Sequence, residues 1–231
     1  MITNRNLVSA VGLAMAMALS SANAAEAGFY VGVQGGQATA DLDQEELDFL
    51  AEDVFLFAGV PLIAGTGSSS LDDGVTTWSV TAGYRLNPYL ALEASYLDLG
   101  TFEYRAGGLV NPPGPVTSLQ ADLGIDFSST GFTTAVIGGI PLGESFDLHG
   151  KLGIFFSETE IEVSVAGDVG NGSDGISSSD TDVFYGAGVS WFIGANWTLG
   201  LDYLLYKDVG NEDDTGETDV ESVTLLAAYR F

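Results

Sequence analysis

The chain has 231 residues, no cysteine, and 32 acidic against six basic side chains, which give it a formal net charge of −26. The lack of cysteine excludes disulfides, thiolate metal sites and cysteine nucleophiles, and the negative charge makes nucleic acid a poor partner. Such acidity is typical of disordered chains, but 46% hydrophobic and 11% aromatic residues argue against disorder, so we expect the acids to be concentrated in loops.

The first 24 residues are typical of a secretory signal peptide. Arg5 and the amino terminus supply positive charge, an apolar run extends from Leu7 to Leu19, and small residues end in Ala22-Asn23-Ala24. We expect cleavage after Ala24, or alternatively after Ala27. The apolar run is shorter than the about 20 residues that a membrane helix needs, which argues against a retained anchor. The predicted organisation is a signal peptide over 1–24 and an exported domain over 25–231.

Eight segments with a period of two follow in the exported part. In the first, Phe29, Val31 and Val33 alternate with smaller or more polar residues, as a strand requires when one face meets lipid and the other a lumen. The segments are Gly28 to Ala38, Thr77 to Leu86, Leu90 to Tyr96, Phe132 to Ile140, Phe146 to Phe156, Val183 to Trp191, Trp197 to Tyr206 and Val220 to Phe231. This pattern predicts an all-β fold, an eight-stranded antiparallel up-and-down transmembrane β-barrel.

The connections between these segments alternate in length. Short turns are expected at 87–88, 141–145 and 194–196, and long polar connections at 39–75, 98–130, 166–182 and 208–219. All long loops therefore lie on one side and all tight turns on the other, which is the asymmetry of bacterial outer-membrane barrels. Outward aromatic residues near the strand ends indicate two interfacial girdles. With this orientation both chain termini lie in the periplasm.

Four stretches carry a resemblance to a known family: Gly28–Gly32, Gly83–Tyr96, His149–Gly153 and Tyr229–Phe231. They resemble the transmembrane-barrel part of the outer membrane protein A group and its small, stand-alone, porin-like relatives. The resemblance extends over the whole mature chain. Larger members of the group append a peptidoglycan-binding periplasmic domain. We expect no such domain here, because the sequence ends at Phe231. The resemblance also implies that Tyr229 and Phe231 form the signal read by the outer-membrane assembly machinery.

Charged residues fall on inward positions of the pattern, and they are the candidate site. These are Arg85, Glu93, Lys151, Asp202 and Arg230. A buried charge without a partner costs several kcal/mol, so we expect them to pair into a network. The family resemblance implies that such a cluster can plug or gate the lumen. We favour a permanent filler, because eight strands leave space for little beyond side chains, and keep a narrow pore for small solutes or ions as the alternative.

His149 is the sole histidine and is expected to point inward near the turn end of its strand. A barrel enzyme that modifies lipid needs a histidine with a serine and a carboxylate at the outer rim, and His149 lies at the opposite end. We therefore expect a hydrogen-bonding role for His149 in the core, no cofactor, and no catalytic activity, with lipid modification as a remote alternative.

Acidic side chains cluster in the predicted loops. They are Asp41, Asp43, Glu45, Glu46, Asp48, Glu52, Asp53, Asp168, Asp174, Asp180, Asp182, Glu212, Asp213, Asp214, Glu217 and Asp219. Such carboxylates could bind divalent cations weakly, but no segment fits the twelve-residue calcium loop, and we favour solvated surface charge.

One of these loops contains an apolar stretch. A short helix is expected over 41–53, followed by the apolar segment Val54 to Ala64. This segment should not face water, so it either packs on the barrel rim or in the lumen mouth, or it forms an adhesive or lipid-contacting patch.

The sequence therefore predicts a protein of the bacterial outer membrane with a structural and surface-interaction role. The expected partners are outer-membrane lipid, lipopolysaccharide and the assembly machinery.

Overall fold

The computed structural model describes residues 27–113, 118–168, 170–211 and 215–231. The predicted signal peptide over 1–24 lies outside these residues. The elements are β1 (Gly28–Ala40), α2 (Gln44–Phe57), β2 (Ser68–Asp72), β3 (Gly74–Asn87), β4 (Leu90–Val110), β5 (Leu119–Leu142), β6 (Phe146–Gly167), β7 (Gly172–Ile193), β8 (Trp197–Asn211) and β9 (Gly216–Arg230).

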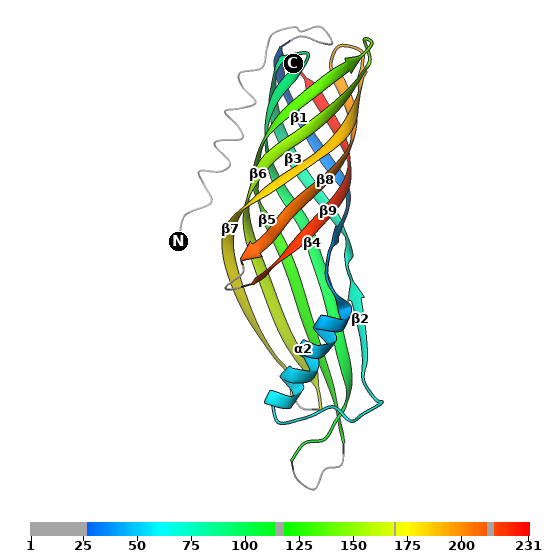
Figure 1. Cartoon of the computed structure of the whole chain (residues 1–231), viewed down its shortest axis with the longest axis vertical. Coiled ribbons are helices and arrows are strands. Elements are labelled where there is room, and N and C mark those ends of the chain that lie inside the picture. Colours follow the sequence, from blue (N-terminus) through cyan, green and yellow to red (C-terminus); the bar gives the residue numbers. More distant parts are fainter. Residues whose placement is uncertain (1–26, 114–117, 169, 212–214) are drawn as a thin grey trace.

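Eight of these strands form a closed ring (Figure 1). The order is β3-β1-β9-β8-β7-β6-β5-β4, and the pairing of β4 with β3 completes it. Every pairing in the ring is antiparallel. The predicted eight-stranded antiparallel barrel is confirmed, and β2 is a short additional strand paired with the far part of β4.

Side chains alternate between the outer and inner surfaces of the barrel wall. On β1, Phe29 and Val33 are more than half exposed, whereas Tyr30 and Gln34 are buried. The outward apolar side chains of the ring include Trp78, Val80, Leu92, Val136, Leu152, Val189, Leu201 and Leu225. The predicted division into an apolar outer face and an inner face is therefore confirmed. Among the described residues, no helix combines the length and apolar character needed to cross a bilayer.

Tight turns join the strands at the end of the barrel where the C-terminus lies (Figure 1). The Asn87 side chain accepts a hydrogen bond from the backbone N–H of Tyr89 (2.8 Å) between β3 and β4. Gly143 and Gly194 have φ angles of 77° and 61°, a left-handed conformation that glycine adopts without steric cost. These turns coincide with the three short connections expected from the sequence.

At the other end, β4 to β7 continue far beyond the barrel (Figure 1). β5 has 24 residues and β6 has 22, whereas a membrane strand needs about 9–11. Most residues of the long connections expected over 98–130 and 166–182 therefore belong to paired strands instead, which corrects that expectation. We call the part formed by residues 101–110, 119–128, 158–167 and 172–181 the projecting sheet.

The polarity of the two faces reverses where the projecting sheet begins, and this explains the error. On β6, the outward side chains are apolar up to Phe156 and are then acidic: Glu158, Glu160 and Glu162. The inward side chains change in the opposite sense, from Asp147, His149 and Lys151 to Ile161, Val163 and Val165. The apolar outward pattern by which the sequence identifies this strand therefore ends at Phe156, whereas the paired strand itself continues to Gly167.

α2 packs on the inner face of the projecting sheet. It begins after Asp43, whose side chain accepts a hydrogen bond from the N–H of Glu45 (2.8 Å). Its buried residues Ala51 and Phe55 belong to an apolar cluster with residues of β4 and β5, namely Tyr104, Val110, Ala121 and Leu123. The helix expected over 41–53 is present but extends to Phe57.

The apolar segment Val54 to Ala64 thus lies on the projecting sheet, beyond the barrel rim. Phe55 is buried, and Leu62 forms an isolated bridge with Val110. These residues pack against the protein as expected, but on the projecting sheet rather than on the barrel rim or in the lumen mouth. Phe57, however, is 90% exposed, so the segment also presents apolar surface to the outside.

Candidate functional site

A buried ion pair crosses the lumen between β4 and β6. The Lys151 Nζ donates to Glu93 Oε1 at 2.8 Å and lies 3.5 Å from Asp202 Oδ2 on β8. The hydroxyl of Tyr30, on β1, donates to the second oxygen of Glu93 at 2.8 Å. All four side chains are buried. Three of the five charged residues that the sequence identified are therefore in direct contact, and all five line one small cavity.

The contacts continue toward the turn end through His149. Its Nε2 lies 2.8 Å from Asp202 Oδ1, and its Nδ1 lies 3.2 Å from Asp147 Oδ1. The Arg85 Nη2 lies 3.1 Å from Asp147 Oδ2. His149 is thus inward and hydrogen-bonded within the core, as expected, and links two carboxylates. The resulting chain of contacts runs from Tyr30 to Arg85 through Glu93, Lys151, Asp202, His149 and Asp147.

Arg230 lies on the inner face of β9, where its guanidinium carbon is 4.7 Å from the centre of the Phe192 ring. The Arg85 guanidinium lies 5.1 Å from the same ring. Cations are attracted to the face of an aromatic ring, so Phe192 supports both arginines at the turn end of the lumen.

The two residues of the proposed assembly signal lie at the end of β9. The Tyr229 ring packs against Trp197 and Phe231, with centroid distances of 5.3 and 5.2 Å. The Phe231 N–H donates to the carbonyl of Phe29 at 3.0 Å.

Sequence reasoning did not include Tyr30 and Asp147 in the site. Both occupy inward positions, and Asp147 was visible as an inward acid in the strand pattern. Their partners, however, are 63 and 62 residues away in the chain. Only the register between strands brings such distant residues together.

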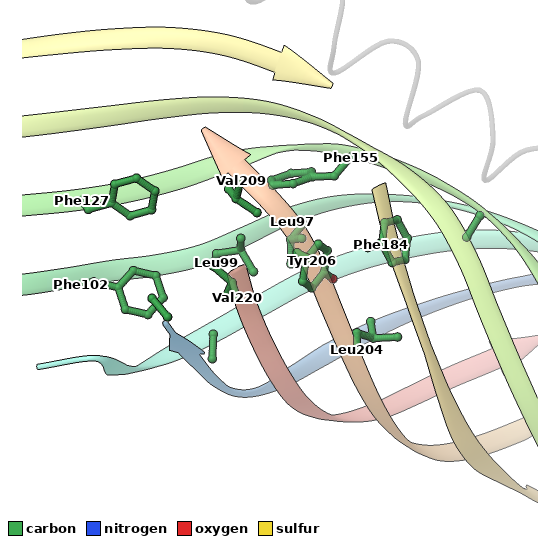
Figure 2. Close-up of a cluster of buried hydrophobic side chains, with 13 residues drawn as sticks. Leu97, Leu99, Phe102, Phe127, Phe155, Phe184, Leu204, Tyr206, Val209 and Val220 are labelled. Carbon is green, nitrogen blue, oxygen red and sulfur yellow. The ribbon is translucent and has the colours of Figure 1, made fainter. Parts of the chain in front are cut away.

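Beyond the polar network, the loop side of the lumen is filled by apolar side chains (Figure 2). The Tyr206 ring packs on Phe184 and Phe155, with centroid distances of 5.0 and 5.7 Å. The other labelled members of this apolar layer are Leu97, Leu99, Phe102, Phe127, Leu204, Val209 and Val220. The charged network expected from the sequence therefore fills only the turn side of the lumen, because the inward positions toward the loops carry large apolar side chains.

The cavities beside the polar network are small. One on the turn side, between Arg85 and Lys151, has a volume of about 40 Å³. Another, between Lys151 and the apolar layer, has a volume of about 10 Å³. Such spaces hold a few water molecules at most.

Most acidic residues of the predicted loops lie on regular elements. Glu45, Glu46, Asp48, Glu52 and Asp53 belong to α2, whereas Asp174, Asp180 and Asp182 belong to β7. Residues 212–214 lie outside the described part. In the described residues, no group of three His, Asp or Glu side chains is arranged to hold a metal ion.

Two of the loop-side carboxylates are held in their charged form by neighbouring donors. Asp219 pairs with Lys207, which lowers the pKa of that carboxyl. Hydrogen bonds from the hydroxyls of Ser69 and Tyr104 lower the pKa of Asp48.

A closed ring of eight strands that is apolar outside and charged inside defines a small membrane β-barrel. The chain belongs to the family described as outer membrane protein beta-barrel domain, which matches residues 8–231. It is therefore a β-barrel protein of the bacterial outer membrane.

Several solved structures are similar to this chain. Ail, the attachment invasion locus protein of Yersinia pestis, has 16% sequence identity and a TM-score of 0.44, covering 90% of this chain and 99% of Ail. Neisserial surface protein A has 15% identity and a TM-score of 0.42, covering 89% and 99%. OprG from Pseudomonas aeruginosa has 14% identity and a TM-score of 0.41, covering 91% and 98%. Among curated proteins, none matches the chain significantly.

Proposed function

We propose that this protein is a non-conducting outer-membrane barrel with a structural and surface-interaction role. The observation that carries the proposal is that two layers of side chains, the charged network and the apolar layer, fill the lumen one above the other. An ion that crosses the barrel would have to break the Glu93–Lys151 pair and then pass the apolar layer around Phe184. Passage through apolar side chains strips an ion of its water, at a cost of several kcal/mol or more.

The proposal assigns the projecting sheet to the outside of the cell and the tight turns and chain termini to the periplasm. Its support is the change of the outer face from apolar to acidic after Phe156, since charged side chains avoid hydrocarbon. In this orientation the outward residues Glu158, Glu160 and Glu162 lie at the level of the lipopolysaccharide headgroups, and divalent cations could bridge these acids to lipid phosphates. Tyr229 and Phe231 would bind the assembly machinery before insertion.

We further propose that the protein is not an enzyme. His149 is enclosed between Asp147 and Asp202 and is only 7% exposed, so a substrate at the outer rim would have no contact with it.

A planar-bilayer recording tests the lumen. We expect the purified protein to produce no discrete current steps, and we expect Phe155→Ala with Phe184→Ala to remain silent, because the Glu93–Lys151 pair still obstructs the path. Discrete steps in the wild type that change in size with Glu93→Ala would favour the narrow pore and overturn the proposal.

Protease treatment of intact cells tests the orientation. We expect cleavage to be confined to the side of the barrel that carries the projecting sheet, the segment 58–67 and the other long connections. Cleavage at the tight turns on intact cells would contradict the assigned orientation.

A further inference from the structure

α2 presents a second, outward-facing surface that its packing on the sheet does not use. Phe49 is 65% exposed, Leu56 61% and Phe57 90%, and Leu50 is also exposed. With 3.6 residues per turn, Phe49 and Leu56 lie in one row and Leu50 and Phe57 in a neighbouring row, two turns apart in each case. Ala51 and Phe55 already fix the helix through the opposite face. These four side chains are therefore not needed to hold α2 in place.

The helix that carries these side chains is held in a defined position. Tyr104, on β4, donates a hydrogen bond to Asp48 at 2.6 Å, and the Gln44 side chain donates to Ser69 on β2 at 3.0 Å. Asp43 caps the first turn. A helix fixed at its start and along its length presents the exposed apolar rows as one surface.

A groove of about 610 Å³ runs beside this surface, between α2 and the segment 61–69. Asp48, Glu52 and Asp53 lie along its helix side. Its apolar lining is formed by Leu56, Pro61, Leu62 and Ile63, and Tyr104 lies at its floor. The groove thus combines carboxylates with apolar side chains within a single cavity.

Among the described residues, no basic side chain pairs with the acids of this groove. In the described part of the chain, neither Glu52 nor Asp53 forms an ion pair, and α2 has no basic residue in its last turn. Arg105, the basic residue of the projecting sheet on β4, is paired with Asp126 and Glu103. Carboxylates without a basic partner in the protein favour a ligand that carries positive charge.

We propose that the outer face of α2 and the adjoining groove bind cationic amphipathic peptides. Lysine or arginine side chains of the peptide enter the groove beside Glu52 and Asp53, and its apolar side chains cover Leu56 and Phe57. An amphipathic helix that lays its apolar face into a groove is a common mode of peptide recognition. The inference rests on the proposed outward position of the projecting sheet, to which it adds the chemical class of partner.

Two other occupants fit the surface less well. A second copy of this chain would bring identical acids against Glu52 and Asp53, and lipopolysaccharide is itself anionic. Lipid chains are also distant, because Tyr104 follows the outward aromatic Tyr96 by eight residues, roughly 25 Å along the strand.

The test uses the full-length protein in nanodiscs of zwitterionic phosphatidylcholine and a fluorescent helical peptide of leucine and lysine, with empty nanodiscs as background. Anisotropy should show saturable binding that weakens as salt is added. We expect the pair Phe49→Ser with Phe57→Ser, and separately the pair Glu52→Gln with Asp53→Asn, to weaken binding about tenfold each, equivalent to about 1.4 kcal/mol.

Matched controls lie on the projecting part of β7, away from α2. Ile176 is 57% exposed and Asp174 is exposed, so Ile176→Ser and Asp174→Asn remove the same kinds of side chain elsewhere. Both variants should bind as the wild type does, and heat-modifiable gel mobility checks that every variant is folded.

Three results would overturn the inference. The first is that the peptide binds the protein-containing nanodiscs no more strongly than the empty ones. The second is that the α2 and β7 variants lose the same amount of affinity. The third is that a peptide with glutamate in place of lysine binds with the same affinity. A concentration-dependent dimer abolished by Phe57→Ser would assign the surface to a second copy instead. Because the assay needs no cells, its failure is distinguishable from a failure of the protease test for orientation.

Discussion

Replacing Lys151 with methionine removes the ammonium that lies between Glu93 and Asp202 while keeping a side chain of similar length. The two contacts, at 2.8 and 3.5 Å, correspond to attractions of about 6 and about 5 kcal/mol at an effective dielectric constant near 20. The cost of burying the ammonium offsets much of this gain. Breaking a buried pair on one side nevertheless leaves uncompensated charge, so we expect the free energy of unfolding to fall by about 3–5 kcal/mol.

Urea unfolding in lipid vesicles, followed by tryptophan fluorescence and gel mobility, measures this loss. Lys207→Met is the matched control, because Lys207 pairs with Asp219 at the exposed rim, where an ion pair contributes little. We expect the unfolding midpoint of this control to stay near that of the wild type. A Lys151→Met variant within about 1 kcal/mol of the wild type would refute the argument that the buried charges depend on one another.

Three further predictions concern the apolar layer and the docking of α2. Gly153→Ala should destabilise the barrel by about 1–3 kcal/mol, since a Cβ there would lie 2.4 Å from the Thr134 carbonyl oxygen and 2.5 Å from the Phe184 ring. Gly150→Ala on the same strand, where the nearest atom lies 3.7 Å away, should leave the stability unchanged, and urea unfolding compares the two. Phe155→Ala should cost about 3–5 kcal/mol in the same assay, and a smaller loss than for Gly153→Ala would contradict the packing of the layer. Because hydroxyl donors hold the pKa of Asp48 below its ordinary 3.8, its contact with Tyr104 stabilises α2 docking above that pH and is lost as the pH falls through the lowered value. Hydrogen-exchange protection of α2 should therefore be retained at pH 5 and drop only below pH 3.8 in the wild type, and Tyr104→Phe should show low protection across this range.

The membrane-spanning part of the fold was predictable because a period of two assigns each side chain of a strand to the inner or the outer face. In each strand the apolar residues mark the outer face, so the inward positions of Glu93, Lys151 and Asp202 follow from the alternation within their own strands. The turns were predictable for a similar reason, since the requirement for glycine or proline at a tight turn is local. None of these inferences needed to know which strand lies beside which.

The projecting sheet was missed because its strands continue with reversed polarity. Outward glutamates after Phe156 are typical of a loop unless a second apolar layer is known to cover the inner face. That layer is supplied by α2, whose Phe55 packs on residues of β4 and β5 that are 49 to 68 positions further along the chain.

The number of barrel strands, the side on which each spanning residue lies, and five of the charges that enter the lumen follow from the amino-acid pattern. The partners of those charges, the roles of Tyr30 and Asp147, the apolar layer beneath the loops and the position of α2 emerge only in the folded chain. Alternation is a property of neighbouring residues, whereas an ion pair or an apolar contact depends on register between strands that are distant in the chain.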